Sequence, residues 1–283
     1  MCDNQPPLST SFKKKNVIVK LFFTIVGVVI LIIMSGKITA VHPETKQLNI
    51  AYADSEQPPY IYGIGMVIPQ NPGAVVDMIK MLEQKIHGLQ INLSRLPWKR
   101  CLEYLKSGQV DGIFNASFTQ KRLKNGAYPM KDGQPDPSKR LVTISYGIYS
   151  LKNSSITWDG KTFRNLNGVV GVNRGFSVVS ELEKMGVPFQ EVNLVSQNLK
   201  KLKLGRIAAV LAQDVTANAL LKDKERFEGI VKLRTPFATK PYYLMLSYQF
   251  IKKYPTVAEQ IWTEIKEIRK FEFDDLVAKY AEE

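Results

Sequence analysis

Short apolar runs alternate with amphipathic stretches along the chain from Gln47 onward. The runs have the length of strands, and the stretches between them carry apolar residues at helical spacing. Such alternation predicts βα units and a mainly parallel sheet. The expected strands are 48–53, 91–96, 110–116, 169–172, 190–192 and 207–211, and the expected helices begin near residues 73, 97, 177 and 198.

The same order of elements occurs twice. In the first block the segment LKSGQVDGIF (105–114) runs from the end of a helix into an apolar strand. In the second block LKLGRIAAVL (202–211) does the same. A repeated plan of this kind predicts two similar lobes. Extended stretches at 141–151 and 242–248 follow the two blocks, and an amphipathic helix is expected over 256–280.

The first forty residues have the features of an export signal. Lys13, Lys14 and Lys15 precede an apolar run over 21–34, and a short polar stretch then ends at Ala40. We expect cleavage after Ala40, with an uncleaved signal anchor as the alternative. Cys2 lies before the apolar run, which argues against a lipoprotein, because a lipid-bearing cysteine stands at the cleavage site.

Removal of residues 1–40 changes both the cysteine content and the charge. The full chain has 283 residues, two cysteines and a net charge of +13. Without the leader only Cys101 remains, so no internal disulfide can form. The leader contains five lysines and Asp3, so the net charge falls from +13 to +9 and the chain stays basic. The remaining lysines are scattered over predicted helices and loops, which indicates solvated faces. Cys101 shares a helical face with Leu102 and Leu105, which predicts a buried and inert thiol.

The order and spacing of several short motifs resemble a known family. The motifs are QPPY at 57–60, GAVVDM at 73–78, LEYLKSGQVDGIF at 102–114, TQKR at 119–122 and YYLMLSYQF at 242–250. Together they resemble the type II periplasmic solute-binding proteins of ABC importers, particularly the family 3 group that includes amino-acid receptors. The similarity extends over about residues 48–280.

The resemblance implies an architecture. We expect an α/β fold of two similar lobes with mainly parallel sheets, joined by two crossing strands and preceded by an N-terminal apolar helix. The expected domains are a signal peptide or signal anchor at 1–40, a first lobe at 41–143 plus 243–283, and a second lobe at 144–242. Ligands of such proteins lie between the lobes, where strands end and helices begin.

The strand over 110–116 leads to the first group of candidate ligand-binding residues. Asn115 and Ser117 stand at its carboxyl end, and Arg122 follows on the next turn. In similar receptors the matching arginine binds the ligand's carboxylate. Arginine suits this role because its planar guanidinium donates two parallel hydrogen bonds and stays charged. By itself, TQKR would better fit a surface arginine at the start of a helix, and the surrounding motifs favour the binding role.

Other candidates belong to the walls of the expected cleft. Tyr60, Tyr62 and Trp98 offer flat rings that can cover a small ligand, although Trp98 could also be a core residue. Ser177 begins the second lobe's first helix, where similar proteins have a hydroxyl that faces the ligand, and it could also be an ordinary N-cap.

One departure from the family bears on the ligand. Amino-acid receptors usually have a carboxylate after the strand that corresponds to 207–211, and here an ungapped match puts Gln213 at that position with Asp214 next to it. A carboxylate-bearing ligand is therefore better supported than an α-amino acid. If Asp214 faces the cleft instead, the amino-acid interpretation recovers.

The sequence thus predicts a monomeric periplasmic binding protein without a cofactor. Its partners would be a small carboxylate ligand and an inner-membrane ABC permease or a sensor protein, and nothing resembles a nucleic-acid module. A sensory module of the same fold is the main alternative. An exported enzyme is less favoured, because neither H-E-x-x-H nor G-x-S-x-G occurs and His42 and His87 have no metal-ligand spacing to Cys, Asp or Glu.

Overall fold

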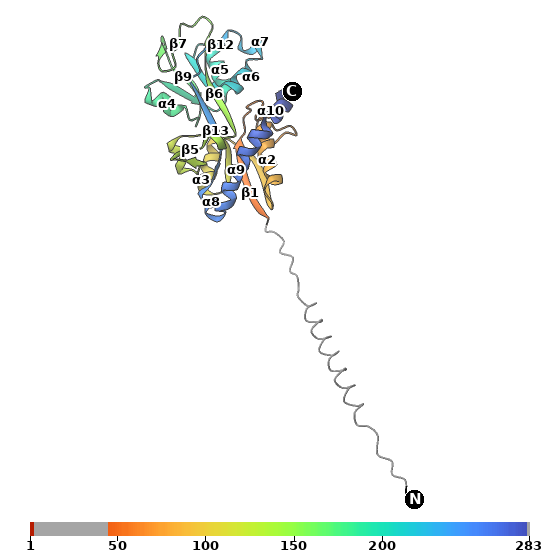
Figure 1. Ribbon diagram of the computed structural model, residues 1–283. Coiled ribbons are helices and arrows are strands. Elements are labelled where there is room, and N and C mark those ends of the chain that lie inside the picture. The colour runs from red at the N-terminus through yellow and green to blue at the C-terminus, as the bar shows by residue number, and fades with distance from the viewer. Residues whose placement is uncertain (3–44, 282–283) are drawn as a thin grey trace. The chain divides into compact units, whose positions relative to one another are not determined.

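The computed structural model describes residues 1–2 and 45–281 (Figure 1). The predicted apolar helix and the predicted cleavage site lie outside these described residues. Within the described part of the chain, every helix is either too short or too polar to cross a membrane.

The first half of the sheet is built around the predicted strand at 48–53. This strand is β1 (Lys46–Ala53), and it pairs in parallel with both β2 (Leu89–Leu96) and β3 (Gly112–Ser117). Helices α2 (Ala74–Lys85) and α3 (Trp98–Ser107) connect the strands. Every residue of β3 is buried, as its apolar sequence predicts for a strand covered on both faces.

The second half repeats this plan. Strand β9 (Val170–Asn173) pairs in parallel with both β10 (Phe189–Val192) and β11 (Ala209–Gln213). In each half the first strand lies in the centre and pairs in parallel with the two strands that follow it, which confirms the internal repeat seen in the sequence. The helices of this half are α4 (Val179–Lys184), α5 (Val195–Lys203), α6 (Asp214–Leu220) and α7 (Lys224–Phe227).

Two long strands join the halves (Figure 1). Strand β6 (Val142–Leu151) pairs antiparallel with β11, strand β13 (Ala238–Leu246) pairs antiparallel with β3, and the two strands pair with each other. The sheet order is β10-β9-β11-β6-β13-β3-β1-β2, with β12 (Ile230–Lys232) paired to β6. The fold is thus the expected α/β arrangement of two lobes joined by two crossing strands.

The C-terminal part differs from its prediction. The sequence predicts one helix over 256–280, but the chain forms α9 (Pro255–Phe271) and α10 (Phe273–Ala281), which are separated at Glu272. Both helices contact α2. An additional helix, α8 (Tyr248–Lys253), begins where the extended stretch ends, because Ser247 Oγ accepts a hydrogen bond from the Phe250 N–H and caps it.

Short elements fill the connections. They are η1 (Gln120–Lys124), β4 (Met130–Lys131), β5 (Gln134–Pro135), η2 (Pro137–Lys139), β7 (Thr157–Trp158) and β8 (Phe163–Arg164). The strands β4 and β5 form a small hairpin within the Pro-, Gly- and Asp-containing stretch 129–137.

Candidate functional site

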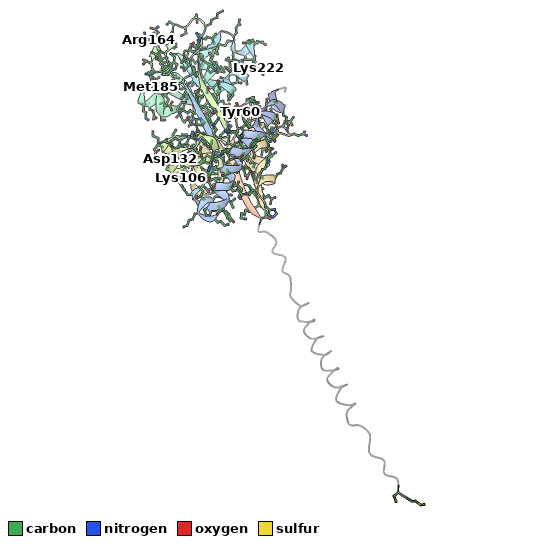
Figure 2. All side chains as sticks on the ribbon, viewed as in Figure 1. Tyr60, Lys106, Asp132, Arg164, Met185 and Lys222 are labelled. Carbon is green, nitrogen blue, oxygen red and sulfur yellow. The ribbon has the colours of Figure 1, made fainter. Side chains whose placement is uncertain are left out.

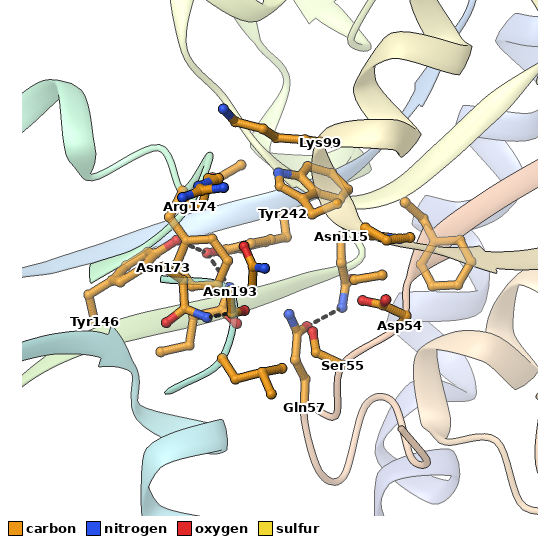
Figure 3. A pocket seen from close by; sticks show the side chains of 18 of the residues that line it. Asp54, Ser55, Gln57, Lys99, Asn115, Tyr146, Asn173, Arg174, Asn193 and Tyr242 are labelled. Carbon is orange, nitrogen blue, oxygen red and sulfur yellow. Dashed lines mark hydrogen bonds between the residues drawn. The ribbon is translucent and has the colours of Figure 1, made fainter. Parts of the chain in front are cut away.

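A pocket of about 320 Å³ lies between the two lobes, at the carboxyl ends of β1, β3, β9 and β11 (Figure 3). Carboxyl ends of strands in an open α/β sheet are the usual place for ligands. The pocket is lined by Ala53, Asp54, Ser55, Gln57, Pro97, Trp98, Lys99, Phe114, Asn115, Ser117, Arg122, Tyr146, Asn173, Arg174, Phe176, Asn193, Leu194, Gln213 and Tyr242.

Arg122 is a fixed positive charge in this pocket. Its side chain extends from η1 and the residue is only 7% exposed. The guanidinium donates from Nη1 to the Ser117 carbonyl (2.6 Å) and from Nη2 to the Gly175 carbonyl (2.9 Å), and it lies 5.3 Å from the centre of the Trp98 ring. A guanidinium has five N–H donors, so these contacts hold its orientation and leave donors for a ligand.

A hydroxyl pair joins the two lobes beside Arg122. Ser117 Oγ donates a hydrogen bond to Ser177 Oγ over 2.8 Å, and Lys240 Nζ donates to the same Ser177 oxygen over 3.3 Å. Ser117 lines the pocket, whereas Ser177 is not among the lining residues, and its hydroxyl meets Ser117 and Lys240 in place of the expected ligand. The expected N-cap role of Ser177 is wrong: α4 begins after Val178, and the helix has no side-chain cap.

Two asparagines that line the pocket carry buried acceptor atoms. The Asn115 amide donates to Gln57 Oε1 (2.8 Å, Figure 3), and the Asn173 amide donates to the Asn193 carbonyl (3.0 Å). The Oδ1 atoms of Asn115 and Asn173 are both buried, and neither has a hydrogen-bond partner among the described residues. Leaving such acceptors without a partner is costly, so a ligand N–H or O–H donor would satisfy them.

The crossing strands supply a hydrogen-bonded chain at the pocket. Gln213 Nε2 donates to the Tyr242 hydroxyl (2.8 Å), which donates to the Tyr146 hydroxyl (2.7 Å). Burial raises the pKa of both tyrosines, so both hydroxyls stay protonated at neutral pH. The bond to Tyr242 of β13 therefore holds the Gln213 side chain at the pocket. Asp214 instead forms an ion pair with Lys232 (3.4 Å) and is not a lining residue.

Tyr60 and Tyr62 are not brought to the pocket. The Tyr60 ring stacks on Phe273 at 6.2 Å, beside α10 (Figure 2), and the Tyr62 ring stacks on Tyr280 at 5.8 Å. Both rings pack against helix α10 and neither residue lines the pocket, so the expectation that they form a cleft wall is wrong. Trp98, at the start of α3, does line the pocket.

The pocket also contains residues that the sequence interpretation missed. Asp54 directly follows β1, and Asn173 ends β9, so the strand-end rule that identified Asn115 could have found both. Tyr146 and Tyr242 carry no such signal, because their position depends on how β6 and β13 pair. Among the lining residues, Lys99, Arg122 and Arg174 are cationic and Asp54 is anionic, so the pocket favours an anionic ligand.

Comparison with solved structures identifies the class of fold. The arginine-binding protein ArgBP of T. maritima, in its P235GK mutant, superimposes with a TM-score of 0.64 at 20% identity, over 84% of this chain and 96% of that one. A histidine kinase sensor domain with similarity to periplasmic binding proteins gives a TM-score of 0.65 at 16% identity, over 82% and 95%. The chain thus has the two-lobe fold of the type II periplasmic binding proteins, as its sequence predicts.

Sequence comparison gives a relative that matches only part of the chain. The arginine-binding extracellular protein ArtP of Bacillus subtilis (strain 168) is 26% identical over 165 residues, which is 56% of this chain and 59% of that protein. The chain therefore matches less than two thirds of this relative's length. No protein-family model matches the chain.

Proposed function

We propose that this protein is an exported solute-binding receptor that captures a small carboxylate-bearing ligand, an amino acid or a related compound, and delivers it to an ABC importer. The observation that carries the proposal is the buried, oriented guanidinium of Arg122 in an interlobe pocket with a cationic excess. A carboxylate bound there would receive charge-assisted hydrogen bonds in a partly water-excluded site.

The proposal includes a division of labour between the lobes. The first lobe, at 41–143 plus 243–283, would bind the carboxylate through Arg122 and Ser117. The second lobe, at 144–242, would close over the ligand with Asn173 and Gln213. The proposed boundaries fall inside β6 and β13, the two strands that pass between the lobes, and a hinge in those strands would let the lobes separate.

A sensory role for the same pocket is the second candidate. It is favoured by the likeness to a histidine kinase sensor domain, with a TM-score of 0.65. In that case the protein would stay attached to the membrane by an uncleaved leader and signal ligand occupancy to a membrane partner. N-terminal sequencing of the exported protein separates the two: a start after Ala40 supports a diffusing receptor, and an intact leader supports the sensor.

Substitution of Arg122 tests the proposed function. A thermal-shift screen of amino acids, small carboxylates and short peptides first identifies a ligand, because a compound that binds the native state raises its melting temperature. We then expect Arg122→Ala to weaken binding of that carboxylate by about 1.5–3 kcal/mol, the contribution of a hydrogen bond to a charged group. Isothermal calorimetry measures the change.

Two further variants sharpen the result. Arg122→Lys keeps the charge and removes the planar pair of donors, so its affinity should fall between those of the wild type and Arg122→Ala. Arg100→Ala removes an exposed cation that is not among the pocket residues, and its affinity should equal the wild type. Equal affinity of Arg122→Ala and Arg100→Ala, both with native melting temperatures, would remove Arg122 from the site.

A further inference from the structure

A second compartment adjoins the pocket that contains Arg122. Its volume is about 180 Å³, and it shares five lining residues with the first pocket. The shared residues are Ser55, Asn173, Phe176, Leu194 and Gln213. The remaining walls come from the loop after β1 in one lobe, and from the start of α5 and from α6 in the other. A ligand in this compartment would therefore also touch both lobes.

The walls of the second compartment are mainly apolar. The apolar lining residues are Pro58, Ile64, Phe176, Leu194, Val195, Ala219 and Leu220. Ile64 is 73% exposed and Leu194 is 41% exposed in this structure. An apolar group bound between them would remove this surface from water, which is favourable by roughly 25 cal/mol per Å².

The charged lining residue of this compartment is Glu56, and its carboxylate is already engaged. Glu56 Oε1 accepts a hydrogen bond from the Gly63 N–H over 2.8 Å, and the Glu56 carbonyl accepts one from Thr216 Oγ1 over 3.0 Å. The second of these bonds ties the β1 loop of one lobe to α6 of the other. The Gly63 bond uses one of the two carboxylate oxygens, and every other lining residue of this compartment is uncharged.

Asn173 marks the junction of the two compartments. It lines both, it is 5% exposed, and its buried Oδ1 has no hydrogen-bond partner in the described part of the chain. An unpartnered acceptor at this point calls for a ligand donor close to the acid group. The donor would lie between the carboxylate at Arg122 and whatever occupies the second compartment.

We propose that the ligand is a carboxylate with a neighbouring N–H or O–H donor and an uncharged apolar tail, and that the tail occupies the second compartment. This inference rests on the proposed function, since it takes Arg122 as the site of the carboxylate. It deepens that function by naming the ligand class. It also separates this protein from one that would bind a ligand with a cationic tail.

A chain-length series tests the proposal on the purified full-length protein. Alanine, norvaline and norleucine share one head group and differ in the apolar tail. We expect affinity in calorimetry to rise about four-fold per added methylene, equivalent to ~0.8 kcal/mol each, until the second compartment is filled. Lysine is norleucine with a terminal ammonium, so it should bind more weakly than norleucine. Propionate and hexanoate form the matching pair without the amino donor, and hexanoate should bind more weakly than norleucine.

The outcomes separate the two proposals. If alanine and norleucine bind equally, or lysine binds as tightly as norleucine, the apolar-tail inference is overturned while the carboxylate receptor stands. If none of the six compounds binds and no carboxylate in the wider screen does, the proposed function itself fails.

A pair of variants locates the tail. Ala219→Phe places a ring in the second compartment, and it should abolish the preference for norleucine over alanine while alanine still binds. Val231→Phe adds the same ring on β12 at a position that lines neither compartment, and it should keep the preference. An unchanged preference in Ala219→Phe with a native melting temperature would show that the tail lies elsewhere.

Discussion

At the scale of single residues, some of the predicted site residues line the pocket and others do not. Ser117 ends a buried strand and Arg122 follows it closely, so both reach the interlobe pocket, and strand ends can be found in a sequence. For Tyr60 and Tyr62 the sequence offers only their aromatic rings as a signal, and rings fill cores as readily as clefts. The stacking partners that draw them away, Phe273 and Tyr280, are more than 200 residues distant in the chain.

Cys101 gives a prediction at the residue scale. Its burial is confirmed: the side chain is fully buried and Sγ donates to the Leu96 carbonyl over 3.4 Å. Burial raises the pKa of the thiol to about 12, so the reactive thiolate is scarce at neutral pH. We expect iodoacetamide at pH 8 to modify Cys101 only as fast as the protein opens. Mass spectrometry follows the reaction.

A denatured control completes this experiment. In guanidinium chloride the Cys101 thiol regains the pKa of an exposed cysteine and should be modified quickly. Modification of the native protein at the denatured rate would show that the thiol is accessible. Cys2 must be replaced by serine in both samples, because it is exposed and would react in either state.

At the scale of elements, helix and strand types were predictable and helix ends were not. The alternation of apolar runs located β1, β2, β3, β9, β10 and β11, because a buried strand needs a short continuous apolar run whatever surrounds it. The division at Glu272 was missed, because the apolar spacing continues through it and the break depends on packing against α2.

The start of α2 supports a prediction about backbone geometry. Gly73, the residue before the helix, has φ +109° and ψ 157°, a region that is essentially restricted to glycine. A Cβ there would lie 2.5 Å from the Tyr60 carbonyl oxygen. Chemical denaturation should show that Gly73→Ala lowers the free energy of unfolding by about 1–3 kcal/mol more than a glycine control with open surroundings, since the overlap adds to the backbone cost.

Gly133→Ala provides that control. Gly133 also has a positive φ, +77°, but a Cβ there would have no heavy atom within 4 Å. Its cost reflects the backbone conformation alone, about 1–2 kcal/mol. Equal losses for Gly133→Ala and Gly73→Ala would mean that the loop holding Tyr60 yields to the added methyl group.

At the scale of the whole two-lobe fold, the described structure has the lobes in contact around the pocket. The Arg122 guanidinium reaches the Gly175 carbonyl, and Lys121 Nζ lies 3.5 Å from Glu183 Oε2. These contacts, with the Ser117–Ser177 bond, link the end of β3 to the region around α4. A ligand that binds both lobes would favour this arrangement over an open one through its differential affinity.

Ser177→Ala tests that coupling. The variant removes the interlobe hydroxyl bond without altering a lining residue, so the affinity for the ligand found in the screen should fall by about 1 kcal/mol, the net value of one hydrogen bond. Calorimetry measures the affinity and small-angle scattering the ligand-induced compaction. Ser180→Ala, which removes a bond to the Ser177 carbonyl within the second lobe, should bind normally. Equal affinities of the two variants would argue against the interlobe bond as part of closure.

The sequence by itself determined the fold class, the repeated lobes, the crossing strands and the arginine that enters the pocket. The fold class and the repeated lobes follow from local apolar periodicity, whereas the crossing strands and the role of the arginine are implied by the resemblance of short motifs to a known family. Periodicity and motifs are both properties of short segments. Only the tertiary structure decided that Gln213 and not Asp214 faces the pocket, that the Tyr60 and Tyr62 rings stack on residues of α10, and that a second compartment lies beside Asn173. Those outcomes depend on contacts between segments far apart in the chain, which local patterns do not encode.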